Sequence, residues 1–396
     1  MKDSSFFTTL SLPNKLLLAS THATIVPTEI SSIINNTIQN ECWNSSIEMA
    51  YHHAVIPQLY RASKQYISVL PKEKQNFIAT ANREIALENM KLSAELIMII
   101  KVLEENRLDY ISIKGPTLSQ QLYQDITIRQ ICDLDILVNE KDLLKIAKLL
   151  QTLGYAPNLP LSLLGNRGFI ARDNDFTFLH PTKKIMIELH WKLFPDRHKM
   201  PLDFTTLYQH ATQINIQDKS IKVLSNEHNL LYLSLHASKH VFEQLKWVCD
   251  LDKLIRNTPD LDIYKVCINA QERNVLEPFI LALLVAHNLY DTPLPRSFFS
   301  FITPTTETLL AQALNYFKED FTTLDEPTKK RIRFIFLQEL NQNKQNKFVA
   351  LFISLFKPSS VDYIYFQLPT YLDFLYPILR PVRLLYKYVI KKQFSN

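Results

Sequence analysis

The sequence predicts an α+β protein in which a small mixed β-sheet is flanked by helical segments on its N-terminal and C-terminal sides. Short β-prone runs lie close together, at residues 110–113, 133–138, 176–179 and 185–190. Before and after them, apolar side chains recur at helical spacing. Only four glycines occur in 396 residues, which is typical of long helices and excludes a glycine-rich phosphate loop.

The composition bounds the class of protein. With 46% apolar and 21% charged residues it is typical of a soluble globular protein, and a net charge of +5 permits an anionic partner without requiring one. The four cysteines lie far apart and form no CxxC pair, so neither a zinc site nor a disulfide framework is expected. The N-terminus lacks a signal-peptide pattern, and the longest apolar run, residues 279–286, is too short to span a bilayer. We expect a cytoplasmic protein.

The chain is long enough for two or three domains. We expect a helical N-terminal segment over residues 1–100, a core over residues 101–225 and a helical C-terminal domain over residues 226–396. In the first segment, apolar residues at helical spacing predict a long helix from Pro71 to Asn106. The residues expected to form its buried face include Phe77, Ile78, Met90, Leu92 and Leu96.

A turn follows the first β-prone run. Gly115 permits a tight strand-to-helix turn, and Pro116 suits the first helical position because no N–H is needed there. The start of such a helix, with Lys114 and Thr117 beside it, can bind an anion such as phosphate. A plain strand–helix corner has the same pattern, so both interpretations stay open.

The run 133–138 carries an acidic pair, Asp133 and Asp135. Alternation along a strand sends both carboxylates to one face, while Leu134, Ile136 and Val138 point into the core. Two like charges so close repel each other, and a cation usually neutralises them. Carboxylate and phosphate oxygens are ligands that suit Mg²⁺.

Two further charged residues lie near the pair in the sequence or in the predicted sheet. Arg129 could brace a carboxylate, hold a phosphate oxygen or form a surface ion pair. On the strand that ends at His190, Glu188 and His190 share one face. If this strand lies beside the aspartate strand, Glu188 completes a three-carboxylate site and His190 lines the same cleft. Otherwise the acids are scattered over the surface.

A helix predicted over residues 226–241 carries His236, Lys239 and His240. The two histidines share a face at a spacing that can bind a transition metal, but no HExxH glutamate accompanies them. Three interpretations remain: a packed histidine pair, a zinc site, or residues that line a cleft together with Lys239 and Asp250.

Together these motifs resemble a known superfamily. The order of strand, glycine turn and helix, Asp-x-Asp strand and later acidic strand is similar to nucleotidyltransferases of the DNA polymerase β type. More closely, KGPTLSQQLY, Arg129, DLDILV, an αβ unit that ends in LGY, and IELHW resemble a bacterial family of uncharacterised nucleotidyltransferases. The His-x3-His helix followed by Trp247 and Asp250 is similar too. The resemblance covers roughly residues 75–260, and toxins of type IV abortive-infection systems share a similar outline.

The resemblance implies a nucleotidyltransferase core in which Asp133, Asp135 and Glu188 bind two Mg²⁺ ions, or Mn²⁺ in their place. Glu188 would also help to deprotonate an attacking hydroxyl. The NTP-binding residues would be Lys114, Gly115, Thr117 and Arg129. The superfamily usually has Gly-Ser at the turn, whereas Pro116 follows glycine here, so phosphate contacts would fall to Lys114 or Thr117. Attack on the α-phosphorus would leave a nucleoside monophosphate on a hydroxyl acceptor and release pyrophosphate.

The acceptor is open among a small molecule, a peptide or protein, and RNA, with tRNA suggested by the toxin resemblance. RNA contacts would fall first to the Lys183-Lys184 turn and to a basic C-terminal helix. That helix could instead lie on a membrane surface, or pack by its apolar face. Its basic residues are Arg380, Arg383, Lys387 and Lys391. Three competing classes are a catalytically silent nucleotide-binding protein, a helical interaction protein and an enzyme that transfers the γ-phosphoryl group.

Overall fold

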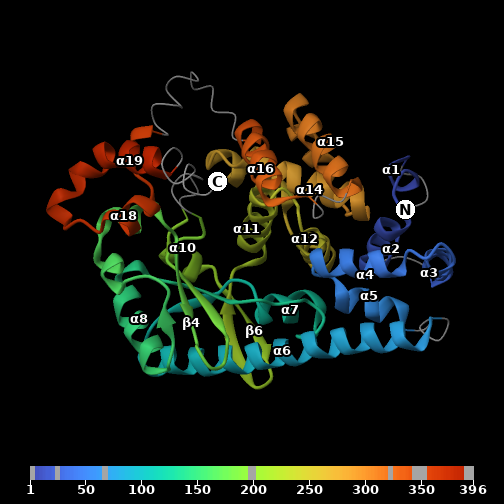
Figure 1. Ribbon diagram of the computed structural model, residues 1–396, viewed down its shortest axis with the longest axis horizontal. Coiled ribbons are helices and arrows are strands. Elements are labelled where there is room, and N and C mark those ends of the chain that lie inside the picture. The colour runs from blue at the N-terminus through green and yellow to red at the C-terminus, as the bar shows by residue number, and fades with distance from the viewer. Residues whose placement is uncertain are drawn as a thin grey trace. The chain divides into compact units, whose positions relative to one another are not determined.

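The computed structural model describes residues 5–22, 27–64, 70–194, 202–319, 324–340 and 355–387. Helices predominate in this part of the chain, and short strands form a mixed sheet, which confirms the predicted α+β class (Figure 1). Within these ranges, no helix combines the length and the apolar character that crossing a membrane requires.

The chain forms two compact units, each assembled from three stretches of sequence. Unit 1 comprises Met1–Val102, Ile111–Leu134 and Leu207–Asn341. Unit 2 comprises Leu103–Tyr110, Asp135–Thr206 and Gln342–Asn396. The predicted division into three consecutive parts stays a prediction.

The N-terminal part is helical, as predicted. Its helices are α1 (Ser5–Thr8), α2 (Leu12–Thr21), α3 (Pro27–Gln39), α4 (Trp43–His52), α5 (Ile56–Ser63) and α6 (Lys72–Glu105). The long helix α6 matches the predicted bounds closely (Figure 1). Ile78, Leu92 and Leu96 are buried, but Phe77 and Met90 are 54% and 53% exposed, so the buried stripe is narrower than the sequence predicted.

Seven strands of the described residues form one sheet, in the order β3-β4-β5-β2-β1-β7-β6. Their bounds are β1 (Tyr110–Ser112), β2 (Leu134–Val138), β3 (Ala156–Pro157), β4 (Asp175–Leu179), β5 (Met186–His190), β6 (Thr212–Ile216) and β7 (Lys219–Val223). In unit 1, β6 and β7 form an antiparallel hairpin, and Ser112 pairs in parallel with Val223. In unit 2, β4 pairs antiparallel with both β3 and β5. The sheet is therefore mixed.

Strand β2 is buried along its whole length. The sequence predicted a strand that included Asp133 and had one accessible face. That prediction is wrong in detail, because the strand begins at Leu134 and all five of its residues are covered. Asp135 is consequently only 1% exposed. A buried carboxylate requires hydrogen bonds or a positive partner, which makes its neighbours informative.

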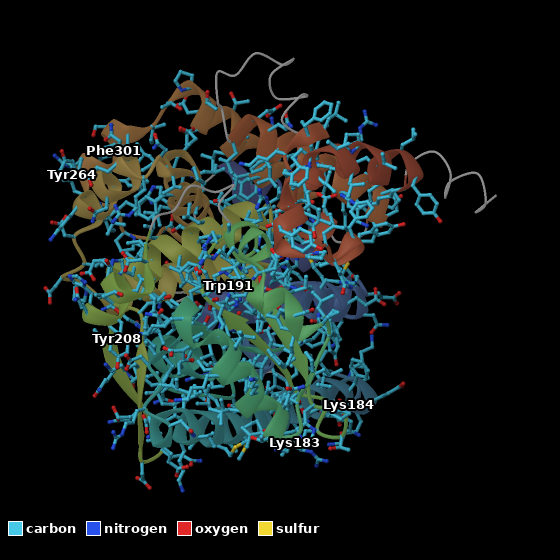
Figure 2. The ribbon with its side chains drawn as sticks, turned by 90° about the vertical axis from the view of Figure 1, so that its left-hand side faces the viewer. Lys183, Lys184, Trp191, Tyr208, Tyr264 and Phe301 are labelled. Atoms are coloured by element: carbon cyan, nitrogen blue, oxygen red, sulfur yellow. The ribbon has the colours of Figure 1, made fainter. Side chains whose placement is uncertain are left out.

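The segments between these strands of unit 2 are short helices and turns. They are η2 (Glu140–Asp142), α8 (Leu143–Thr152), η3 (Leu161–Gly165) and α9 (Arg167–Arg172), and α10 (Phe204–Gln209) follows β5. Gly154 ends the α8 region at a φ of +89°, the left-handed conformation that glycine adopts without strain. Lys183 and Lys184 lie at the surface in the β4–β5 turn (Figure 2).

The C-terminal part of unit 1 is helical. Its elements are α11 (Asn226–Lys239), α12 (Leu245–Asn257), α13 (Ile263–Glu272), α14 (Leu276–Tyr290), η5 (Arg296–Phe301), α15 (Pro304–Lys318) and α16 (Glu326–Leu340). Helix α11 begins where the sequence predicted, because Ser225 caps it by accepting a hydrogen bond from the His228 N–H. The apolar run 279–286 is a fully buried stretch of α14, so it is a core helix.

The last described elements of unit 2 are α18 (Ser360–Phe366), η7 (Thr370–Leu375) and α19 (Tyr376–Leu385). The basic residues of α19 face inward, where buried Asp362 accepts hydrogen bonds from Arg380 at 2.7 Å and Arg383 at 2.5 Å. Ile378 and Val382 are 63% and 59% exposed instead. Leu385, an apolar residue of the predicted packing face, is 59% exposed as well. Packing by that face is therefore not met in the described part of the helix, and Tyr388 and Val389, which also belong to it, lie outside the described residues. Lys391 lies outside the described residues.

Candidate functional site

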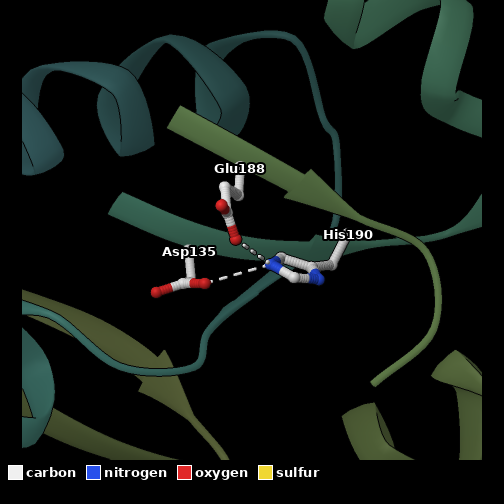
Figure 3. A group of neighbouring side chains, drawn as sticks. All are labelled: Asp135, Glu188 and His190. Carbon is white, nitrogen blue, oxygen red and sulfur yellow. Dashed lines mark hydrogen bonds and ion pairs between the residues drawn. The ribbon is translucent and has the colours of Figure 1, made fainter. Parts of the chain in front are cut away.

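Two carboxylates and an imidazole meet in unit 2. Strands β2 and β5 are neighbours in the sheet, so Asp135 lies close to Glu188 and His190, which share one face of β5 (Figure 3). His190 Nε2 lies 3.0 Å from Asp135 Oδ1 and 3.4 Å from Glu188 Oε2. One ligand atom from each of the three side chains lies within 4.8 Å of the others. The strand that carries Glu188 therefore lies beside the strand that carries Asp135, which is the condition on which the predicted Glu188 site depended.

His190 carries a positive charge into this acidic cluster. Its burial lowers the pKa, but hydrogen bonds to Asp135 and Glu188 and the negative charges of Asp135 and Asp175 outweigh burial and raise the pKa to about 9. The other ring nitrogen, Nδ1, lies 3.3 Å from the side-chain nitrogen of Asn174. At neutral pH the imidazolium therefore neutralises part of the charge of the two carboxylates.

The donor set fits a divalent cation. Asp135 and Glu188 supply hard carboxylate oxygens of the kind that Mg²⁺ binds, and an imidazole nitrogen suits a transition ion such as Mn²⁺. The Glu188 side chain is 28% exposed, so its carboxylate also reaches solvent. Asp133 is partly buried and lies two residues before Asp135, just outside β2. Its predicted part in the site stays a prediction.

The Lys114-Gly115 turn forms as predicted, between β1 and helix α7 (Pro116–Tyr123). Gly115 has a φ of +66°, and a Cβ added to it would lie 3.3 Å from the backbone oxygen of Asp133. The glycine thus permits the turn and also a close approach to the backbone of the acidic pair. The Thr117 hydroxyl is buried, donates to the Lys114 carbonyl at 2.8 Å and lies 2.9 Å from Ser112 Oγ. Thr117 therefore closes the turn.

Arg129 braces a carboxylate, the first of the interpretations left open above. Its guanidinium donates to both oxygens of Asp250, with Nε at 3.0 Å from each and Nη2 at 2.9 Å from Oδ2. Both side chains are buried, so neither forms a surface ion pair. A bidentate pair of this kind fixes the segment that leads to Asp133 against α12.

Lys246 is a residue that the sequence did not single out. It is 7% exposed, and its ammonium lies 3.4 Å from the Gln130 carbonyl. Burial lowers its pKa to about 8, and the nearby charge of Arg129 acts in the same direction. A buried lysine beside an arginine and near an acid is unusual outside functional sites. The sequence offers only one hint of this role, which is that Lys246 lies four residues before Asp250 on the same helix. A lysine in the first turn of an ordinary surface helix has the same spacing, so the hint does not distinguish a functional lysine from a structural one.

His236 and His240 lie together at the end of α11, with Trp247 beside them. In the described part of the chain, the one group of three or more potential metal ligands is Asp135, Glu188 and His190. Zinc binding by the histidine pair therefore lacks a third ligand among these residues. Lys114 and Lys239 are close enough to lower the pKa of both histidines, in addition to the larger effect of burial.

Comparisons with known proteins identify the family. No curated protein matches the chain. A structure of the lincomycin-bound lincosamide antibiotic adenylyltransferase LnuA matches 41% of this chain and 94% of its own at 18% identity, with a TM-score of 0.30. A nucleotidyltransferase-like antigenic protein from Paracoccidioides brasiliensis matches 48% of this chain and 91% of its own at 16% identity, with a TM-score of 0.29. Residues 39–291, well over half of the sequence, match the model of a family described as uncharacterised nucleotidyltransferases, and the chain belongs to that family.

Proposed function

We propose that the protein is a metal-dependent nucleotidyltransferase that moves a nucleoside monophosphate from an NTP to a hydroxyl acceptor and releases pyrophosphate. The observation that carries this proposal is the meeting of Asp135, Glu188 and His190 on adjacent strands in a chain of this family. A catalytically silent binding protein has no need for two carboxylates that repel each other at such short range.

Asp135 and Glu188, with Asp133 immediately before β2, would hold Mg²⁺. When bound, the metal ions would neutralise charge on the phosphates and lower the pKa of the acceptor hydroxyl. Asp135 is rigidly placed on a strand that is covered on both faces, so its carboxylate keeps its position. Glu188 reaches solvent, which allows it to accept the proton of an incoming hydroxyl.

The triphosphate would bind at the Lys-Gly turn. The start of α7 presents the positive end of a helix dipole, and Lys114 adds a full charge. The hydroxyl of Thr117 is engaged within the turn, and Lys114 carries a positive charge that attracts phosphate oxygens, so we assign the side-chain phosphate contact to Lys114. Lys246 adds a second positive charge near Asp133, whereas Arg129 acts as a positioning residue through its pair with Asp250. Charge stabilisation by such cations is the main requirement of phosphoryl-type transfer.

The test is transfer of an α-labelled nucleotide. Purified protein, Mg²⁺ and each α-labelled NTP are incubated with a lysate of the host, beside a variant that carries Asp133→Ala and Asp135→Ala. We expect label on an acceptor with the wild type and at least a thousandfold less with the variant, since metal and charge positioning supply most of the catalysis. The size and nuclease sensitivity of the labelled product identify the acceptor as a small molecule, a protein or RNA. Equal labelling by the variant would refute the assignment of the carboxylates.

A further inference from the structure

Three aromatic rings gather at the junction of α11 and α12 in unit 1. The ring centroids of His236 and His240 are 4.8 Å apart, and those of His236 and His240 lie 5.2 and 5.1 Å from Trp247. We call these three residues the aromatic cluster. The rings are not parallel to one another, with interplanar angles from 38° to 86°, so the cluster presents both ring faces and ring edges.

The aromatic cluster is accessible and has polar atoms to offer. All three residues are partly exposed, whereas the other two tryptophans, Trp43 and Trp191, are 1% and 4% exposed. Among the described residues, no side-chain hydrogen bond engages the ring nitrogens of the cluster. Polar ring atoms in a purely packed histidine pair are ordinarily hydrogen-bonded. These rings are instead suited to contact a ligand.

Charges around the cluster favour an anionic ligand that carries a flat ring. Lys114 and Lys239 act on both histidines. Arg333 acts on His240 too, but it is paired with the carboxylate of Glu243, so the two lysines supply the charge that would attract an anion. Burial and these cations lower the pKa of His236, and they lower that of His240 to about 3, so both imidazoles are neutral at pH 7. Neutral imidazole and indole rings stack on a planar heterocycle without electrostatic repulsion, while the cations beside them attract negative charge.

We propose that the aromatic cluster binds the nucleobase of the NTP. This inference rests on the proposed function, because it uses the same nucleotide. Lys114 connects the turn with the cluster, since it opens the turn assigned to the triphosphate and its charge is near enough to lower the pKa of His236 and His240. A nucleotide has this arrangement of groups, with phosphates near one cation and a base near the rings. An aromatic acceptor can also stack on these rings, but it carries no triphosphate to bind at Lys114, so the nucleobase fits the arrangement better.

Trp247 provides the test, because its fluorescence reports on stacking. The full-length protein is titrated with ATP, GTP, CTP, UTP, adenosine, tripolyphosphate and tyrosine amide, and Trp247→Phe identifies the signal that belongs to this residue. We expect nucleotides and adenosine to quench Trp247 and tripolyphosphate to leave it unchanged. His236→Ala or His240→Ala should weaken adenosine and ATP binding about tenfold, the effect of losing one stacking contact. Tripolyphosphate should stabilise the variants against heat as much as it stabilises the wild type.

Control variants separate stacking from folding. His240→Phe keeps a ring and should restore most of the affinity that alanine loses. His210→Ala removes an exposed histidine that contacts His228 elsewhere in unit 1, and it should change nothing. If ATP stabilises the protein but leaves Trp247 unquenched, the cluster assignment is overturned and the proposed function stands. Quenching by tyrosine amide and not by nucleosides would overturn the assignment and identify an aromatic acceptor as the ligand of the cluster. Failure of every NTP to stabilise the protein would overturn both.

Discussion

Metal binding at Asp135 and Glu188 should compete with the proton on His190. The imidazolium Nε2 lies 3.0 Å from Asp135 Oδ1 and 3.4 Å from Glu188 Oε2, and these carboxylates raise its pKa to about 9. A divalent cation on the same oxygens replaces the positive charge that the proton supplies. Binding therefore releases the proton of His190.

The size of this competition follows from the pKa. Below pH 9, the apparent metal affinity falls about tenfold for each unit by which the pH is lowered, because nearly every molecule must lose a proton from His190 to bind the metal. Between pH 7 and pH 8 we therefore expect about tenfold tighter binding and about one proton released per protein. His190→Gln cannot be protonated, so its affinity should change little over this interval.

Isothermal titration calorimetry with Mn²⁺ measures both quantities. Titrations at pH 7 and pH 8, each in two buffers of different ionisation enthalpy, give the affinity and the number of protons released. Wild-type affinity that changes less than twofold, with no proton released, would refute the competition. An equal pH dependence in His190→Gln would assign it to another group.

Three more predictions concern stability. Without metal, the raised pKa of His190 stabilises the protein fully below pH 6.5, and this contribution of about 3 kcal/mol to the free energy of unfolding is lost as the pH rises through 9. Urea unfolding in the presence of a chelator, at pH 6 and at pH 9.5, measures the loss. A loss of equal size in His190→Gln would contradict the assignment to His190. Arg129→Met leaves the buried carboxylate of Asp250 unpaired and should lower the free energy of unfolding by about 3–5 kcal/mol, most of which is recovered when Asp250→Leu is added. Denaturant unfolding measures this change, and a single variant as stable as the wild type would show that the pair is dispensable. Gly115→Ala forces a side chain into a φ of +66° at 3.3 Å from a backbone oxygen and should cost about 1–3 kcal/mol; an unchanged melting temperature would argue against strain at this turn.

Local pattern was sufficient to predict the elements that carry the candidate site. The alternation of Met186 to His190 placed Glu188 and His190 on one face, and the Lys-Gly-Pro sequence predicted the turn into α7. These features depend on backbone geometry over a few residues, which the sequence determines directly.

Contacts distant in sequence were harder to foresee. Arg129 pairs with Asp250 across 121 positions, and Lys246 becomes buried only because α12 packs beside the segment that contains Gln130. The same reason explains the end of the chain, where one buried acid, Asp362, turns the basic side of α19 inward. A helical pattern identifies two faces, but the partner decides which of them is covered.

The central claim is that the chain transfers a nucleoside monophosphate. Its most direct test compares ATP labelled at the α-phosphorus with ATP labelled at the γ-phosphorus, in parallel reactions with the host lysate and with Asp135→Asn as the inactive control. The account predicts that only the α label reaches the acceptor, that the γ label leaves in pyrophosphate, and that the control transfers neither. Transfer of the γ label, or transfer of the α label by Asp135→Asn at the wild-type rate, would contradict it.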